Sequence, residues 1–180
     1  MRRLVRCSPL FSLAILAGLT LSGCRREERA RLRATEEEAP MLASIVHVAD
    51  PRTSAQLLKG FYDVEQNSWR WTKGKFAVAL RPPLGATQLG AILTVKLAVP
   101  EPVIVGLGRV TLSATVGGVA LPPETYSLPG EYTFLREVPA GALSGDSVTV
   151  QFSLDKTMPA GEVDRRELGI VVTTVGLQPK

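Results

Sequence analysis

Histidine and cysteine are nearly absent from this sequence of 180 residues, which has one histidine and two cysteines. A zinc or other transition-metal site needs several such ligands that converge, and His47 alone cannot supply them. No Asp-x-Asp-x-Asp-Gly loop is present to indicate a calcium site. His47 lies in the apolar run SIVHVAD, where an outward-facing strand residue or a hydrogen-bonded core imidazole is expected rather than a general base. We therefore predict no metal and no cofactor.

The short motifs that accompany common catalytic chemistries are also missing. The sequence has no Gly-x-Ser-x-Gly elbow, no phosphate-binding loop and no Gly-x-Gly-x-x-Gly fingerprint. Carboxylates for glycoside hydrolysis are present, among them Asp63, Glu65, Glu131 and Glu137, but nothing selects two of them as a catalytic pair. We expect a protein that is not an enzyme.

The N-terminus has the three parts of a secretory signal peptide. MRRLVR is positively charged, residues 10–21 (LFSLAILAGLTL) form an apolar run, and LSGC follows. As a helix this run of 12 residues would reach only about 18 Å, well short of the roughly 30 Å hydrocarbon core of a bilayer. LSGC resembles a bacterial lipobox, in which cleavage before Cys24 is accompanied by attachment of a diacylglyceryl group and a further acyl chain, such as palmitate. The alternative is an ordinary secretory cleavage site in which the cysteine is a coincidence.

The lipobox changes both the cysteine count and the charge of the mature chain. Cys7 leaves with the signal peptide and Cys24 is acylated, so neither a disulfide nor thiol chemistry is expected. The formal charge of +4 falls to about +1 once the three arginines of MRRLVR are removed, which gives no support for nucleic-acid binding. We expect the chain to be held to a membrane of the bacterial cell envelope through Cys24. Because Arg25 rather than aspartate follows the cysteine, we expect the outer membrane in a host with two membranes.

Residues 25–40 (RREERARLRATEEEAP) contain five arginines, five glutamates and almost no large apolar side chain. Such a stretch cannot bury enough surface to offset the entropy lost on ordering, so a flexible tether is predicted. A coiled-coil or partner-binding helix is the alternative, although no a/d seam is present. The predicted organisation is a signal peptide over residues 1–23, a lipidated cysteine with its tether over 24–42, and a folded domain over 43–180.

The folded region consists of runs that alternate between apolar and polar residues, separated by turns rich in proline and glycine. RVTLSATV and DSVTVQFSL place apolar side chains on one face only, which is typical of antiparallel sheets with one solvated face. AILTVKLAV does the same, and the last run, LGIVVTTVGL, is apolar on both faces and favours a central position. Helix is expected at most over residues 54–59. Eight to ten short strands predict an all-β antiparallel sandwich, with a jelly roll preferred over an immunoglobulin-like order.

Aromatic residues make up only 6% of the chain, yet several gather in GFYDVEQNSWRW, residues 60–71. A second group of charges, DRRELG at residues 164–169, precedes the last strand. This pair of motifs resembles β-sandwich modules found in or beside bacterial glycosyltransferases and cell-surface polysaccharide proteins. The resemblance covers about residues 57–177, and its matching residues are Gly60, Phe61, Tyr62, Glu65, Arg70, Trp71, Asp164, Arg166, Leu168 and Gly169. It implies a jelly-roll-like accessory or binding fold with glycan as the ligand.

Alternation along a strand puts Trp69 and Trp71 on one face and Arg70 on the other. Exposed tryptophan rings would stack on sugar rings while polar groups fix the hydroxyls, so the candidate ligand-binding residues are Tyr62, Glu65, Trp69 and Trp71. In the structural alternative, both tryptophans cap the core and Arg70 pairs with Glu65 or Asp164. The candidate structural ion pairs are Glu65, Arg70, Asp164 and Arg166.

Two functions from different classes remain open. The first is a lipid-anchored, non-catalytic module of the cell envelope that binds carbohydrate or envelope polysaccharide. The second is a structural or assembly lipoprotein that docks on another envelope protein through a sheet edge or an apolar patch. The exposure of the tryptophan face separates them.

Overall fold

The computed structural model describes residues 42–162 and 164–180. The predicted signal peptide, Cys24 and all of the predicted tether before Leu42 lie outside the described residues. No helix in the described part of the chain is long and apolar enough to cross a membrane.

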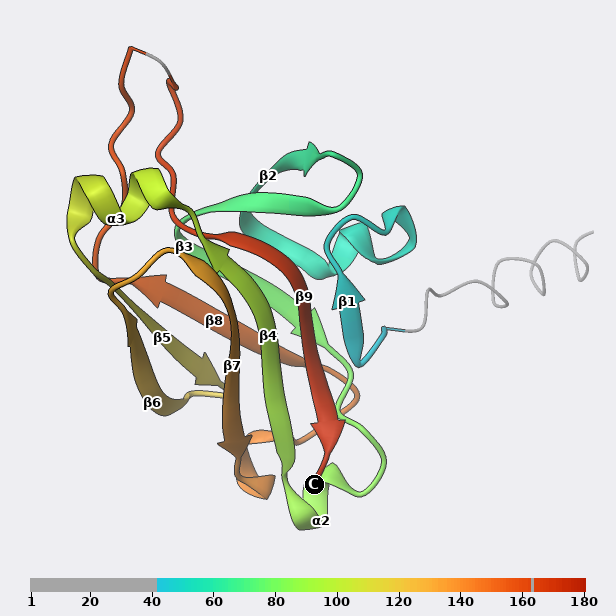
Figure 1. The fold of residues 1–180 in the computed structure, drawn as a ribbon. Coiled ribbons are helices and arrows are strands. Elements are labelled where there is room, and N and C mark those ends of the chain that lie inside the picture. Colours follow the sequence, from blue (N-terminus) through green and yellow to red (C-terminus); the bar gives the residue numbers. More distant parts are fainter. Residues whose placement is uncertain (1–41, 163) are drawn as a thin grey trace, which may run out of the picture. The chain divides into compact units, whose positions relative to one another are not determined.

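Nine strands and a few short helical turns make up the described domain (Figure 1). The strands are β1 (Ile45–His47), β2 (Leu57–Glu65), β3 (Trp69–Leu80), β4 (Ala91–Val99), β5 (Val110–Val116), β6 (Val119–Tyr126), β7 (Gly130–Val138), β8 (Val148–Leu154) and β9 (Val171–Pro179). The helices are α2 (Ala86–Leu89) and α3 (Glu101–Leu107), with 3-10 turns η1 (Pro51–Gln56) and η2 (Ala140–Ala142). The predicted count of eight to ten strands is confirmed.

Strand pairing is antiparallel throughout and follows a nested order. The first strand pairs with the last, β1 with β9, and inside this pair lie β3 with β8, β4 with β7 and β5 with β6. This is the pairing of one long hairpin rolled up into two sheets, which is a jelly roll. Hydrogen bonds join all nine strands in the order β6-β5-β8-β3-β9-β4-β7, with β1 on β9 and β2 on β3. We treat this continuous sheet as two layers, β1-β9-β4-β7 and β6-β5-β8-β3, that meet at β3 and β9. The prediction of an all-β antiparallel sandwich of the jelly-roll kind is confirmed.

Strand β3 joins the two sheets at one corner of the sandwich. Its C-terminal half, Lys75–Leu80, pairs with β8, whereas Arg70 and Trp71 in its N-terminal half pair with β9. Gly74 lies between the two halves, and a Cβ there would come within 2.9 Å of side-chain atoms of Thr157 and Glu167. The bend of β3 therefore brings the chain that follows β8 into close contact with the middle of β3.

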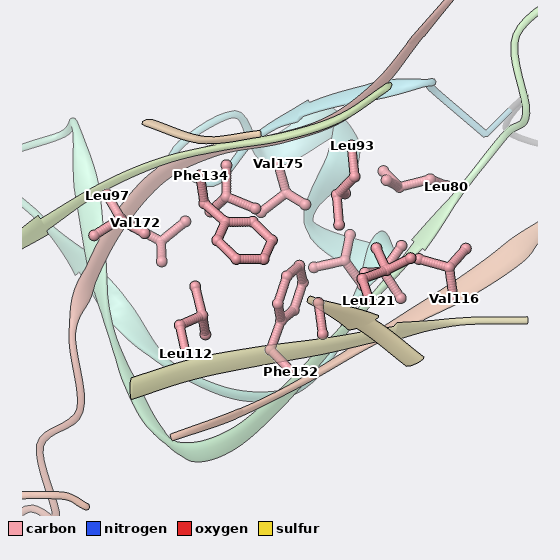
Figure 2. Packing of buried hydrophobic residues seen from close by; sticks show 14 of the residues in the cluster. Leu80, Leu93, Leu97, Leu112, Val116, Leu121, Phe134, Phe152, Val172 and Val175 are labelled. Atoms are coloured by element: carbon pink, nitrogen blue, oxygen red, sulfur yellow. The ribbon is translucent and has the colours of Figure 1, made fainter. Parts of the chain in front are cut away.

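The hydrophobic core fills the space between the two sheets (Figure 2). Phe134 from β7 and Phe152 from β8 extend toward each other from opposite layers, with Leu97 and Val172 on the first side and Leu112 on the second. Within the second sheet, Phe152 also stacks on Phe76 of β3 at a centroid distance of 4.7 Å. Leu97, Leu112 and Phe152 come from faces that alternation marks as apolar.

The strand patterns give the correct inward faces, and the short helices are where prediction was wrong. The inward residues expected on β4 and β5 are all buried, as are Val148, Val150 and Phe152 of β8. The last strand is flanked by β4 on one edge and by β1 and β3 on the other, so its predicted central position is confirmed. The stretch VPEPV, residues 99–103, has the composition of a turn, but residues 101–107 form α3, because Pro102 fits the first turn of a helix and Gly108 ends it at φ 75°.

Candidate functional site

The hairpin of β2 and β3 carries the aromatic residues that the sequence singled out. Its turn has Gln66 and Asn67 at φ 49° and 53°, in the left-handed region, and places Glu65 directly opposite Trp69. Residues opposite each other in an antiparallel pair present their side chains on the same face. Glu65 and Trp69 therefore share a face, and alternation adds Trp71 to it.

The two tryptophans form a pair on this face. Their ring centroids are 6.3 Å apart with an interplanar angle of 79°, an edge-to-face arrangement. Both side chains are half-buried, and Trp71 packs against the edge of the core while Trp69 does not belong to that cluster. Neither description offered by the sequence, a fully exposed grip or a buried cap, fits, because both side chains are only partly exposed.

Arg70 lies on the opposite face and is bonded to the backbone. Its Nε donates to the carbonyl oxygen of Val48 at 2.7 Å, and its Nη1 donates to that of Tyr62 at 2.8 Å. The predicted ion pair of Arg70 with Glu65 or Asp164 is wrong. Carbonyl oxygens from two segments satisfy the planar donors of the guanidinium, so no carboxylate is needed there.

Arg166 makes the ion pairs instead. Its Nη1 donates to Glu65 Oε1 at 2.8 Å, its Nη2 donates to Asp164 Oδ2 at 2.8 Å, and its Nε donates to Asp164 Oδ1 at 3.0 Å. The hydrogen bonds from Arg166 hold the pKa of Asp164 below its ordinary value, and the carboxylates in turn raise the pKa of Arg166. The guanidinium also lies over the ring of Tyr62, 5.1 Å from its centre. Arg166 thus fastens the loop between β8 and β9 to the hairpin.

Tyr62 is held from several sides. Its hydroxyl donates to the carbonyl oxygen of Glu167 at 2.8 Å, and the Lys73 ammonium lies 5.5 Å from the ring centre. Burial raises the pKa of Tyr62 above its usual value. With its hydroxyl bonded and cations over its ring, Tyr62 positions its neighbours rather than offering a free stacking surface. We define the hairpin platform as Tyr62, Glu65, Trp69 and Trp71, in which the two tryptophans provide the free aromatic surface.

Two glycines of the predicted motifs are required by close packing, Gly60 between the two strands of the hairpin and Gly169 where the loop meets β3. Gly60 has φ +78°, and a Cβ there would come within 2.1 Å of the Lys75 carbonyl oxygen. A Cβ on Gly169 would meet the side chains of Leu154 and Thr72 at 2.6 and 2.7 Å. The two motifs are about a hundred residues apart in sequence and in direct contact in the fold, where the amide of Gly169 donates to the Thr72 carbonyl oxygen at 2.7 Å.

A groove that sequence reasoning missed continues from the hairpin platform along β3. Its volume is about 370 Å³, and it lies between β3 and the chain that follows β8. Its lining residues are Lys73, Gly74, Lys75, Leu154, Asp155, Lys156, Thr157 and Glu167. The signal was present in WRWTKGK, because the alternation that pairs Trp69 with Trp71 continues to two lysines. The contribution of Lys156 could not be read from that stretch.

No family model matches the sequence, and no curated protein matches it. Eight solved chains are similar in structure. One is the CBM36-1 domain of a multidomain xylanase from the hindgut metagenome of Trinervitermes trinervoides, with a TM-score of 0.41 and 10% identity over 76% of this chain and 96% of that one. Another is the carbohydrate-binding module CBM36 in complex with calcium and xylotriose, with a TM-score of 0.38 and 7% identity over 74% of this chain and 98% of that one.

Proposed function

We propose that this chain is a lipid-anchored, non-catalytic module of the bacterial cell envelope that binds polysaccharide through the hairpin platform. The observation that supports the proposal is the pair of half-buried tryptophans on one face of β3, with charged and hydroxyl groups beside them. A partly exposed tryptophan whose orientation is fixed by packing presents a rigid apolar surface to a ligand. The apolar face of a sugar ring is a ligand of that shape.

The surrounding bonds keep the platform in place before a ligand arrives. Arg166 fixes Glu65, and the Tyr62 hydroxyl is fixed by the loop that follows β8. A surface that is already ordered loses less conformational entropy on binding, which favours affinity. The second oxygen of the Glu65 carboxylate remains an acceptor for a sugar hydroxyl, since a carboxylate has several lone-pair directions.

Membrane attachment through Cys24 is part of the same proposal and rests on the sequence. The charged n-region, the apolar run and LSGC together support an acylated cysteine, and the charged residues 25–40 would separate the domain from the bilayer surface. Replacing Cys24 with alanine is expected to abolish incorporation of radiolabelled palmitate and to release the protein from the membrane fraction. A Cys24→Ala protein that still takes up label and stays with membranes would contradict the anchor.

Binding is tested with the full chain, purified in detergent, on an array of envelope and plant polysaccharides. The Trp69→Ala, Trp71→Ala double variant is expected to lose binding. The control is Leu84→Ala, Leu89→Ala, which removes two exposed apolar side chains near α2, at the other end of the domain from β2 (Figure 1). Since Trp71 contacts the core, near-ultraviolet circular dichroism must show that the double variant is folded.

Trp69→Ala alone keeps the experiment decisive if the double variant does not fold, because Trp69 lies outside the core cluster. A folded Trp69→Ala protein with undiminished binding to every polysaccharide that the unaltered protein binds would exclude the hairpin platform as the site. Failure of the unaltered protein to bind any polysaccharide would overturn the proposed function.

A further inference from the structure

The outward row of β3 changes character along its length. In alternation, the side chains that share the face of Trp69 and Trp71 are Lys73 and Lys75, both exposed, while Thr72 and Phe76 on the opposite face are buried. From Trp69 to Lys75 the strand advances six residues, or about 20 Å at roughly 3.3 Å per residue. An extended chain lying along β3 would meet two aromatic rings first and two ammonium groups next.

The cationic half of this row opens into the groove beside β3. Half of the six lysines in the sequence line that groove: Lys73, Lys75 and Lys156. The Lys156 ammonium donates to the carbonyl oxygen of Leu107 at 3.2 Å. The salt bridges formed among the described residues involve none of these three lysines.

The two carboxylates that line the groove accept hydrogen bonds from backbone amides and a hydroxyl group. Asp155 Oδ1 accepts the amide of Thr111 at 2.6 Å. Glu167 Oε1 accepts the Thr157 hydroxyl at 2.9 Å and the amide of Gly74 at 3.2 Å. These bonds hold the carboxylates to the groove wall, while the ammonium groups, on long flexible stems, can reach a ligand. With three ammonium groups against two carboxylates, the groove lining has a formal excess of one positive charge, which favours ligands of negative charge.

We propose that the ligand of the hairpin platform is an acidic polysaccharide, whose sugar rings lie on Trp69 and Trp71 and whose anionic groups contact Lys73, Lys75 and Lys156. This inference rests on the proposed function and adds the charge of the ligand. Its anionic groups are carried by the sugars, as carboxylates or phosphates. Ammonium groups bind both as point charges, without the planar geometry that arginine imposes.

The test compares two polymers with the same sugar backbone, polygalacturonate and its fully methyl-esterified form, in which an uncharged ester replaces each carboxylate, with the full chain in detergent. Polygalacturonate is expected to bind more tightly at low salt, and the difference should disappear near 1 M salt, where the Debye length falls to about 3 Å. The Lys73→Gln, Lys75→Gln, Lys156→Gln variant should weaken polygalacturonate binding about tenfold, as expected from three exposed charge contacts of about twofold each. Binding of the esterified polymer should be unchanged in that variant.

The other three lysines provide a matched control. Lys59→Gln, Lys96→Gln, Lys180→Gln removes the same charge from residues that do not line the groove and should leave both affinities within about twofold, because none of the three makes a contact there. Equal losses in the two triple variants would show a general charge effect and overturn the inference. So would equal affinity for the two polymers, but that result leaves the proposed function standing, since it needs only the sugar rings.

Inorganic polyphosphate separates an acidic sugar from a bare polyanion. We expect it to bind more weakly than polygalacturonate and to be insensitive to Trp69→Ala. If it binds as tightly, and Trp69→Ala weakens neither ligand, the surface accepts any polyanion and the proposed function itself fails. A complete lack of polygalacturonate binding at low salt would overturn the inference.

Discussion

Tyr126 and Tyr132 are two neighbouring tyrosines for which removal of the hydroxyl should have opposite effects. Their rings are 4.6 Å apart, and phenylalanine in either place keeps that contact. The Tyr126 hydroxyl is buried and has no hydrogen-bond partner among the residues that the structure describes, whereas the Tyr132 hydroxyl donates to the Leu128 carbonyl oxygen at 2.8 Å. A buried hydroxyl without a partner costs about 1 to 3 kcal/mol, and a typical hydrogen bond contributes about 0.5 to 1.5 kcal/mol.

Tyr126→Phe is therefore expected to raise the free energy of unfolding by up to about 1 kcal/mol, and Tyr132→Phe to lower it by about 1 kcal/mol. For a domain of this size these changes correspond to a thermal midpoint about 2 to 5 °C higher and lower, respectively. The measurement is thermal unfolding of the full chain followed by circular dichroism at neutral pH, with urea unfolding as a second method. A Tyr126→Phe protein less stable than the original by more than about 0.5 kcal/mol would refute the assignment of an unpaired hydroxyl.

Unfolding at alkaline pH tests the burial of the Tyr126 hydroxyl through its deprotonation. Burial raises the pKa of Tyr126 in the folded protein above its ordinary value of 10.0. The stability due to the protonated hydroxyl is complete below pH 10, where both states keep the proton, and is lost as the pH rises toward the folded pKa. Tyr126→Phe should thus show a shallower loss of stability above about pH 10 than the unaltered protein. Equal slopes for the two proteins would contradict the burial of Tyr126.

Three further outcomes follow from the hairpin, the loop and the N-terminal segment. Gly60→Ala should lower the free energy of unfolding by more than about 2 kcal/mol, because its positive φ strains any other residue and a Cβ would overlap a backbone oxygen of β3. The control Gly118→Ala, at φ +85° with nothing within 4 Å of the added Cβ, should lose only the backbone strain, about 1 to 2 kcal/mol. Equal losses for the two variants in chemical unfolding would refute the packing account. Because the hydrogen bonds from Arg166 lower the pKa of Asp164 in the folded state, the stability from this pair is present above the ordinary pKa of 3.8 and is lost as the pH falls below it. Between about pH 5 and pH 2, the thermal midpoint should therefore fall less in Asp164→Asn than in the unaltered protein. An equal fall in both proteins would contradict the pair. Deleting residues 26–40 should leave the thermal midpoint within about 5 °C, and a larger drop would show that this segment stabilises the domain.

The strand faces were predictable because burial of one face forces the sequence to alternate. Val110, Leu112, Ala114 and Val116 line the core, and their neighbours point outward, so β5 needed no tertiary information. Helix α3 was not predictable in the same way. Its sequence, EPVIVGL, contains a proline and a glycine that equally suit a turn, and only the length of the connection between the two sheets decides in favour of a helix.

The candidate site was predictable as far as a strand's own geometry extends. Alternation correctly placed Trp69 and Trp71 together and Arg70 opposite. The partner of Arg70 was beyond reach, because a sequence shows carboxylates but not the carbonyl oxygens of Val48 and Tyr62 that converge there in the fold. Arg166 took the place expected for Arg70 for the same reason: which arginine meets Glu65 depends on where a loop a hundred residues away crosses the hairpin.

That crossing follows from the topology. Strand β3 pairs with β8 along one half and with β9 along the other, so the chain that joins β8 to β9 must pass over the middle of β3. At this crossing the Gly169 amide donates to the Thr72 carbonyl oxygen, and the Arg166 guanidinium lies over the Tyr62 ring. Tyr62, Arg166 and Gly169 are therefore explained by their role in holding the chain between β8 and β9 against the middle of β3, and this role does not require a ligand.

The same reasoning separates the residues that the fold needs from those that it does not. Trp69, Lys73 and Lys75 contribute no hydrogen bond to the crossing and lie on the outward face of the bent strand, where a polar residue of any kind would serve the fold. Trp69 is half-buried and its ring meets that of Trp71 edge to face, but it lies outside the core cluster, so the core itself does not require it. The proposed ligand would give this ring a role. Trp69→Ser should therefore change the thermal midpoint by less than about 3 °C, and a larger loss would return Trp69 to a structural role.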